Sequence, residues 1–278
     1  MKLSFIKTNP TENMTVFILD PVPRSMYSDI SKKIMDYSSI CAEQVGFIEK
    51  PTDGNGEACV RLHMMGGEFC GNAARALAAV MVRKGDAKIR FENGRYLVPL
   101  EVSGADEVLC CEVVKADHGK YITTVKMPLH HALVETVIPY RGKDITGTWI
   151  QFEGIMHLIV DGEQIESKEE FFNIVKNSLA DEEWEAFGIM FYNEPDGFME
   201  PLVYVRSTDS TVWERGCGSG TTAVGIYTAY KSNREIDMEV RQPGGSLRIK
   251  AEWKDREVTS VYLTGDVSIV AEGMLYID

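Results

Sequence analysis

Two stretches of the chain repeat one local pattern, and this repeat limits the folds that the chain can adopt. The first, Cys70–Leu77, opens a run rich in alanine, leucine, valine and methionine that continues to about Lys84. The second, Cys217–Val224, opens a similar run that ends near Lys231. Glycine, asparagine and serine after the cysteine are typical of a helix start, and lysine is typical of a helix end. Each pattern predicts a helix that begins immediately after a cysteine.

The segments around these two helices also correspond. Each helix follows a strand-like run and precedes a pair of strand-like runs, joined by Asn93-Gly94 in one half and Gly244-Gly245 in the other, as in a hairpin. Upstream, each half has a helical stretch and then a strand. The corresponding segments are 28–37, 45–48, 58–63, 89–91 and 96–102 in the first half, and 168–179, 188–192, 201–206, 238–241 and 247–251 in the second.

This internal correspondence predicts two similar domains. We expect an α+β fold with two pseudo-symmetric domains, each a curved sheet or barrel around a central helix, and an active site in the cleft between them. The expected first domain covers residues 1–132 and carries Cys70, and the second covers residues 133–267 and carries Cys217. A last strand, at about 268–278, is expected to return to the first domain.

Composition excludes several classes of protein. The 29 basic and 42 acidic residues give a net charge of −13, which repels phosphate backbones and argues against nucleic acid as a partner. The start of the chain lacks the apolar stretch of a signal peptide. No run of about 18 apolar residues is present, so we expect no membrane span.

The cysteines indicate a reducing compartment. They form no C-x-x-C pair, and the chain is long enough to build a core without disulfides. We therefore expect thiols in a cytoplasmic protein, with the adjacent Cys110 and Cys111 as core residues of a strand. The six cysteines are Cys41, Cys59, Cys70, Cys110, Cys111 and Cys217.

A cysteine at a helix start has a chemical advantage. The unpaired N–H groups and the positive dipole end there lower the pKa of a thiol and also bind a carboxylate. Gly71 and Gly218 would let a substrate approach the backbone closely. One helix start could therefore hold an amino acid by its carboxylate and present a base to its α-carbon.

Two such sites that face each other would permit inversion. One cysteine, as thiolate, would remove the α-proton, and the other, as thiol, would return a proton to the opposite face. N–H donors aimed at the carboxylate would stabilise the carbanion-like intermediate, so we expect no cofactor and no metal. Duplication without function is the alternative. A phosphate loop at Gly216–Gly220 is disfavoured, because the Gly-Lys-Ser/Thr ending is missing.

At these residues the sequence resembles the diaminopimelate epimerase superfamily of cofactor-independent racemases. Cys70–Arg75 is similar to the Cys-Gly-Asn-Gly-x-Arg motif of that family. Glu214-Arg215-Gly216 is similar to its Glu-Arg-Gly element, and Cys217–Thr221 to its second cysteine motif. In this chain the last two elements abut, as they do in histidine and proline racemases.

The closer resemblance, over nearly the whole chain, is to the histidine racemases of opine-metallophore pathways. It rests on segments 9–15, 41–49, 68–72, 188–190, 213–214 and 242–246. The resemblance implies an amino-acid racemase that interconverts L- and D-histidine, and it implies a homodimer.

The resemblance also implies roles for individual residues. Cys70 and Cys217 would be the two acid/base residues. Glu214 would meet the α-ammonium group or a side-chain nitrogen, and Arg215 matches an arginine that epimerases use on a distal carboxylate. The other substrate-binding residues would be Asn13, Glu43, Gln44, Gly71, Asn72, Gly218, Ser219 and Gly220. We interpret His63 and His157 as partly buried, hydrogen-bonded histidines outside the site.

Other functions stay open at this point. Epimerisation of diaminopimelate is disfavoured, because Ile155-Met156 and Ile189-Met190 stand where that family has asparagines for the distal end of its substrate. Arg215 favours it. A non-catalytic binding protein of the same fold is a third hypothesis. An isomerase of the phenazine-biosynthesis type is a fourth, although that type lacks the paired cysteines.

Overall fold

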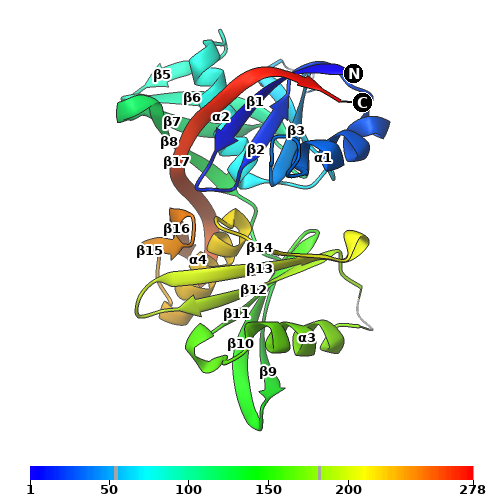
Figure 1. The fold of residues 1–278 in the computed structure, drawn as a ribbon. Coiled ribbons are helices and arrows are strands. Elements are labelled where there is room, and N and C mark those ends of the chain that lie inside the picture. Colours follow the sequence, from blue (N-terminus) through cyan, green and yellow to red (C-terminus); the bar gives the residue numbers. More distant parts are fainter. Residues whose placement is uncertain (53–55, 181–182, 278) are drawn as a thin grey trace. The chain divides into compact units, whose positions relative to one another are not determined.

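The computed structural model describes residues 1–52, 56–180 and 183–277 (Figure 1). Contacts divide the chain into two compact units. Unit 1 comprises Met1–Lys126 and Tyr262–Asp278, and unit 2 comprises Met127–Val261. Each unit combines a curved sheet with two α-helices, which confirms the predicted α+β class.

The strands of unit 1 form a closed ring. Hydrogen-bonded pairs run in the order β1, β2, β3, β4, β6, β7, β8 and β17, and β17 pairs again with β1. The elements are β1 (Lys2–Asn9), β2 (Thr15–Ile18), α1 (Tyr27–Met35), β3 (Gln44–Glu49), β4 (Val60–Met64), α2 (Gly71–Lys84), β5 (Arg90–Glu92), β6 (Arg95–Val102), β7 (Leu109–Lys115), β8 (Lys120–Met127) and β17 (Glu257–Tyr276).

Helix α2 is the central helix of this ring. Every residue from Gly71 to Val82 is buried, and the helix contacts β2, β6 and β7. Many of its side chains are alanines, whose small size lets strands approach the helix from several sides. Helix α1 packs on β3, where Tyr27, Ile30 and Ile34 join an apolar cluster with residues of β1, β2 and β3.

Unit 2 repeats this connectivity. As β2–α1–β3 and β4–α2–β6 do in unit 1, β11–α3–β12 and β13–α4–β15 join parallel strands through a helix. Its elements are β9 (Ala132–Tyr140), β10 (Lys143–Phe152), β11 (Ile155–Val160), α3 (Lys168–Ser178), β12 (Ala186–Asn193), β13 (Phe198–Val205), β14 (Ser210–Trp213), α4 (Gly218–Ser232), β15 (Ile236–Gln242) and β16 (Gly245–Lys254). The short 3₁₀ turns of the chain are Arg24–Met26, Asp117–Gly119, Gly162–Gln164 and Arg206–Thr208.

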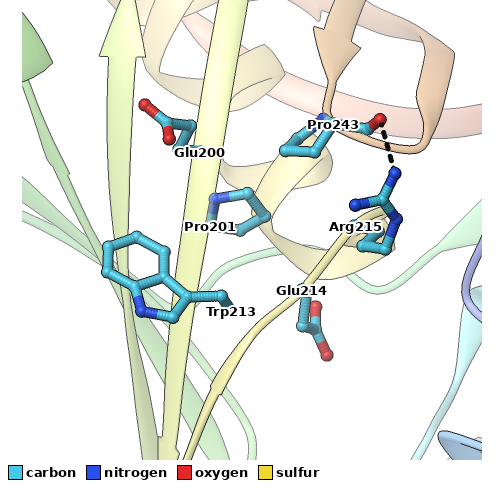
Figure 2. A pocket seen from close by; sticks show the side chains of 6 residues that line it. All are labelled: Glu200, Pro201, Trp213, Glu214, Arg215 and Pro243. Carbon is cyan, nitrogen blue, oxygen red and sulfur yellow. Dashed lines mark hydrogen bonds between the residues drawn. The ribbon is translucent and has the colours of Figure 1, made fainter.

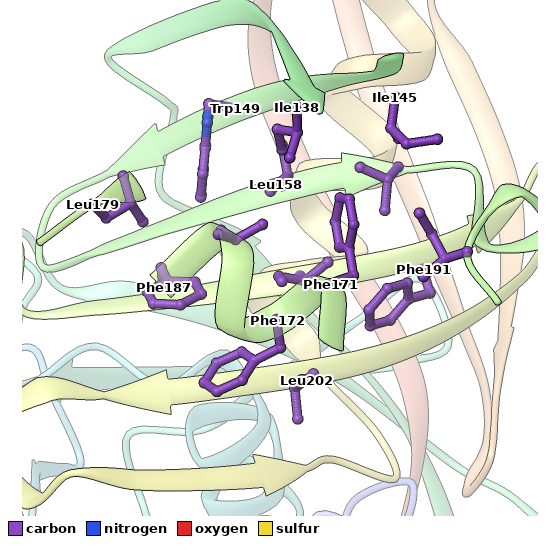
Figure 3. Packing of buried hydrophobic residues seen from close by; sticks show 14 of the residues in the cluster. Ile138, Ile145, Trp149, Leu158, Phe171, Phe172, Leu179, Phe187, Phe191 and Leu202 are labelled. Atoms are coloured by element: carbon purple, nitrogen blue, oxygen red, sulfur yellow. The ribbon is translucent and has the colours of Figure 1, made fainter. Parts of the chain in front are cut away.

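The two helices of unit 2 differ in how they are buried. Helix α3 is amphipathic and packs Phe171, Phe172 and Val175 into an aromatic cluster with Phe187 and Phe191 of β12 (Figure 3). Helix α4 is buried along most of its length and contacts β10, β11, β12, β15 and β16. This contact with so many strands makes α4 the counterpart of α2.

The structure confirms the expected helices, strands and hairpin turns of both halves. In the β5–β6 turn both Asn93 and Gly94 have positive φ, 51° and 81°, as the Asn-Gly dipeptide predicts. The last strand is longer than expected. It begins at Glu257 and has 20 residues, because buried Val261, Leu263 and Val267 have the even spacing of a strand. None of the described helices is long and apolar enough to span a bilayer.

A turn after β6 supports the segment that leads into α2. The Ser103 hydroxyl donates to the Glu68 carbonyl at 2.8 Å and accepts from the Met64 amide at 3.0 Å. Gly104 follows with φ +71°, and a β-carbon there would lie 2.5 Å from the backbone nitrogen of Phe69. This contact fixes the backbone next to Cys70.

We predict that Gly104→Ala destabilises the protein more than backbone strain alone requires. Gly94→Ala is the matched control, because Gly94 has φ +81° and a β-carbon added there would have no atom within 4 Å. The control is expected to lose about 1–2 kcal/mol for a left-handed alanine. Gly104→Ala should lose at least about 1 kcal/mol more, because the Phe69 backbone must move. Equal losses in urea unfolding would show that the contact is unimportant.

Candidate active site

Cys70 is the N-cap residue of α2. Its backbone is extended, with φ −130° and ψ 105°, and its Sγ accepts a hydrogen bond from the Ala73 amide at 3.4 Å. The side chain is half-buried. Because the first amides of a helix have no partners within the helix, the sulfur occupies a position where negative charge is stabilised.

Cys217 repeats this geometry in unit 2. It is the N-cap of α4, with φ −91° and ψ 111°, and its Sγ accepts from the Gly220 amide at 3.2 Å. Its Sγ also lies 3.6 Å from the Ser219 hydroxyl. Cys217 is only 2% exposed. The prediction that both helices begin directly after a cysteine is confirmed.

A chain of polar side chains lies beside the start of α2. The Asn72 amide donates to Asn13 Oδ1 at 3.2 Å, and the Asn13 amide donates to Glu43 Oε2 at 3.1 Å. Asn13 is 1% exposed and Asn72 is 3% exposed, whereas Glu43 is half-buried. Three residues predicted for the site are therefore connected.

Gln44 and Gly71 complete the predicted residues of unit 1. The backbone amides of Glu43 and Gln44 both donate to the Met14 carbonyl, at 2.8 and 3.1 Å. This pair of bonds joins the start of β3 to the residue after Asn13. Gly71 is buried as the first residue of α2.

Gln242 holds the backbone around Cys217. Its Oε1 accepts from the Cys217 amide at 2.6 Å, and its Nε2 donates to the Thr221 hydroxyl at 2.8 Å. The Thr221 hydroxyl in turn donates to the Cys217 carbonyl at 2.6 Å. Gln242 is only 5% exposed. The start of α4, with Gly218, Ser219 and Gly220, is thereby tied to the end of β15.

The expectation of a lowered thiol pKa is wrong for Cys217. Burial is the largest cause that raises its pKa well above the usual value, and the Glu214 carboxylate raises it further by its charge and a hydrogen bond. The Ser219 hydroxyl and the Gly220 amide act in the opposite direction and are weaker. Cys217 is therefore a neutral thiol near pH 7.

Arg215 lies in an open pocket of unit 2 (Figure 2). Its guanidinium points to the hairpin turn and donates to the Pro243 carbonyl at 3.3 Å. The Gly244 amide donates back to the Arg215 carbonyl at 2.7 Å, and the Glu214 amide donates to the Pro201 carbonyl at 3.0 Å. The pocket is lined by Glu200, Pro201, Trp213, Glu214, Arg215 and Pro243.

An apolar wall lies next to Cys217. A β-carbon on Gly220 would lie 2.2 Å from the Met190 sulfur and 3.0 Å from Cys217 Sγ. A β-carbon on Gly188 would lie 2.7 Å from Met190 Cε and 2.5 Å from His157 Nδ1. Met190 is fully buried. Only glycine at position 220 therefore leaves room for this thioether beside the thiol.

The interpretation of His157 as a hydrogen-bonded, partly buried histidine is wrong. The ring is fully buried, and neither nitrogen has a hydrogen-bond partner among the described residues. Burial lowers its pKa to about 3, so the ring is neutral near pH 7. His63 agrees with the interpretation, because it is half-buried and its Nδ1 lies 2.9 Å from the Met64 carbonyl.

Sequence reasoning does not single out two residues that support the cysteines. Gln242 falls within a resembling segment, but its position 25 residues after Cys217 gives no signal of a contact with it. Arg75 stands out only as part of a motif, yet it is fully buried and donates to Thr11 and Asn72. Over the described ranges, no group of three or more histidine, cysteine or acidic residues could hold a metal ion.

Comparisons with known proteins identify related racemases and epimerases. A family model described as the histidine racemase CntK N-terminal domain matches residues 2–276. The chain is 35% identical to the histidine racemase of Fusobacterium nucleatum subsp. nucleatum, over 99% of this chain and 97% of that protein. It is 25% identical to the diaminopimelate epimerase of Xanthomonas campestris pv. campestris, over 83% and 81% of the two chains.

The fold has solved counterparts. The structure of a probable proline racemase from Agrobacterium radiobacter K84 superimposes with a TM-score of 0.69, at 11% identity, over 99% of this chain and 93% of that one. Fold and relatives together define the class of protein as an isomerase of the racemase and epimerase type. Within that class, the chain belongs to the histidine racemase family.

We predict that Gln242→Leu lowers both stability and the function of Cys217. The variant leaves the Cys217 amide without its acceptor, so the free energy of unfolding should fall by about 1–3 kcal/mol. Thr228→Val is the control, because the Thr228 hydroxyl bonds the Val224 carbonyl at 2.8 Å on the same helix, away from the cysteine. Racemase activity should fall at least tenfold only in the Gln242 variant. Equal activity in the two variants would contradict a role for Gln242.

Proposed function

We propose that this protein interconverts L- and D-histidine without a cofactor, with Cys70 and Cys217 as the two bases. The observation that carries the proposal is the repeated geometry. In each unit a cysteine caps the central helix, and its sulfur accepts a backbone N–H from that helix. Membership of the histidine racemase family supports both the reaction class and the substrate.

The proposed chemistry moves one proton off the substrate and one proton onto it. A thiolate on one side takes the α-proton, and a thiol on the other side donates its proton to the opposite face. This mechanism requires the two units to present their cysteines to one α-carbon, in a cleft between them. The high pKa of Cys217 supports its role as the proton donor in the resting enzyme.

The helix starts would also bind the substrate carboxylate. Gly71 and Asn72 begin α2, and Gly218, Ser219 and Gly220 begin α4. Amides at both starts would stabilise the charge that spreads onto the carboxylate when the α-proton leaves. Because these donors and the two thiols supply the acid, the base and the anion stabilisation, the proposal needs no cofactor and no metal.

We predict that Cys70→Ser and Cys217→Ser each lower racemisation at least about a thousandfold, because a serine hydroxyl is a far weaker acid than a thiol. Either variant should still exchange the α-proton of one enantiomer in heavy water through its remaining thiol. Cys110→Ser is the control, because Cys110 is exposed on β7, contrary to the expected core position. Polarimetry and mass spectrometry measure the two rates. Full racemisation by either single variant, or thiol alkylation without effect, would favour the binding-protein hypothesis.

Histidine fits the surroundings better than diaminopimelate. Ile189 packs in the hydrophobic core of unit 2, and the position of Met190 beside Gly220 supports apolar surroundings near Cys217. An imidazole tolerates apolar surroundings, and its ring N–H needs one hydrogen-bond acceptor, for which the proposal assigns Glu43. A second ammonium and carboxylate would lose their hydration there without new partners.

Arg215 is the observation that favours diaminopimelate as the second candidate. It is exposed, and its side-chain hydrogen bond to the Pro243 carbonyl is long at 3.3 Å. A distal carboxylate could form a stronger, charge-assisted bond with this guanidinium. The whole-length identity of 35% with a histidine racemase, against 25% over part of the chain with a diaminopimelate epimerase, argues for the first candidate.

We predict that kcat/KM for L-histidine exceeds that for L,L-diaminopimelate by on the order of a thousandfold, since desolvating a second charged head costs several kcal/mol. Arg215→Gln should change the histidine value little and should lower any activity on diaminopimelate. A panel of L-amino acids in heavy water, read by α-deuteration, provides the measurement. A higher value for diaminopimelate would overturn the substrate assignment and leave the reaction class intact.

Two further properties belong to the proposal. None of the six cysteines forms a disulfide, which supports a reducing, cytoplasmic location. A homodimer rests on the family resemblance alone.

A further inference from the structure

Arg75 is among the largest fully buried side chains of the described residues. Its Nε donates to Asn72 Oδ1 at 3.1 Å, its Nη2 to the Thr11 hydroxyl at 3.0 Å, and its Nη1 to the backbone carbonyl of Asp266 at 3.0 Å. All three acceptors are neutral. No carboxylate among the described residues forms an ion pair with this guanidinium. A buried cation without an anionic partner is unfavourable unless an anion forms nearby.

The Cys70 thiol, five residues earlier at the start of the same helix, can supply this anion, and the Asp266 carboxylate offsets the charge by a smaller amount. Burial lowers the pKa of Arg75 to about 10, and the negative charge of Cys70 is the largest effect in the opposite direction. Arg75 therefore stays charged near pH 7. Because Coulomb attraction is mutual, a charge at Arg75 favours the thiolate of Cys70 to the same extent.

Arg75 also determines how two amides are oriented. A guanidinium can only donate hydrogen bonds, so Asn72 must turn its oxygen to Arg75 and its NH₂ group to Asn13. Asn13 must then accept with its oxygen and donate with its nitrogen to Glu43, which accepts as a carboxylate. Because Arg75 can only donate and the Glu43 carboxylate can only accept, the orientations of the two amides between them are fixed.

The other charged groups near this network are mostly acidic. Glu12 lies in the loop before Asn13, Glu68 precedes Cys70, and the exposed Asp266 side chain is on β17. Together with Glu43, these carboxylates disfavour a thiolate. The Lys7 ammonium is engaged by the carbonyls of Ile40 and Cys41, at 2.7 and 3.2 Å. Arg75 is thus a buried cation whose positive charge can offset the negative charge of these carboxylates.

We propose that Arg75 is a positioning residue that holds Cys70 as thiolate and fixes the amide orientations of Asn72 and Asn13, so that the resting enzyme has a base at Cys70 and an acid at Cys217. This inference rests on the proposed two-base function. In the first half-cycle Cys70 gains the α-proton and Cys217 loses its proton to the product. The enzyme therefore ends with the two protonation states exchanged, and solvent must restore them.

The test is the pH dependence of cysteine alkylation, which needs no substrate. Iodoacetamide is applied to the intact protein between pH 5 and 10, and the rate at each cysteine is read by peptide mass spectrometry. The absolute rate depends on reagent access, whereas the midpoint of the pH profile reports the thiolate fraction in the conformation that reacts. In the wild type, Cys70 should have a lower midpoint than Cys217. The reverse order would overturn the proposal without any variant.

Variants separate charge from packing. Arg75→Met should raise the Cys70 midpoint by about one pH unit, which slows the reaction roughly tenfold at pH values well below the midpoint, whereas Arg75→Lys should stay closer to the wild type. Arg83→Gln is the matched control, because Arg83 is exposed on the same helix and lies 3.9 Å from Glu272.

The electrostatic role of Arg75 and the proposed function would fail in different measurements. An unchanged Cys70 midpoint in Arg75→Met, or an equal shift in Arg83→Gln, would overturn the electrostatic role. If Arg75→Met does not fold, as judged by circular dichroism, the wild-type order of midpoints and the Arg75→Lys profile still decide the question. Failure of racemisation with intact alkylation profiles would instead count against the proposed function.

Discussion

Each unit is organised around a helix whose first turn is capped by a sulfur atom. Sulfur is a weak hydrogen-bond acceptor, and cysteine is not among the residues that best stabilise a helix start. The stability of α2 and α4 must therefore come from burial within their sheets. Once buried, the first-turn amides lie in a low-dielectric environment, where their attraction for an anion is strong. Burial within the sheets thus makes a weak cap chemically useful.

The two sulfur-capped helices occupy different electrostatic environments. Cys217 is almost fully buried, next to Glu214, and both effects favour its neutral thiol. Cys70 is half-buried and shares its helix with the buried charge of Arg75. Similar backbones therefore hold two thiols in different electrostatic surroundings. The proposed acid and base, which are of the same chemical kind, would differ only through their neighbours, and a duplicated fold can supply such a pair.

Local sequence predicted the local structure well and the electrostatics poorly. The helices after Cys70 and Cys217, the Asn93-Gly94 turn and the repeated order of elements follow from short-range patterns. The raised pKa of Cys217 does not, because it depends on burial that only the folded chain creates. Gln242 comes from a distant strand, and the hydrogen bonds of Arg75 reach Thr11 and Asp266, far from it in sequence. No spacing rule could connect them.

The path of β17 determines when the protein can complete its fold during translation. Its residues 262–276 close the ring of unit 1 by pairing with β1, whose Lys2 lies opposite Tyr276. All of unit 2 is synthesised between β8 and that strand. At a synthesis rate of about 5–20 residues per second, the edges of β1 and β8 remain unpaired for roughly 8–30 s. During that time the apolar core around α2 is incompletely covered, so the nascent first half is the stage at which chaperones matter most.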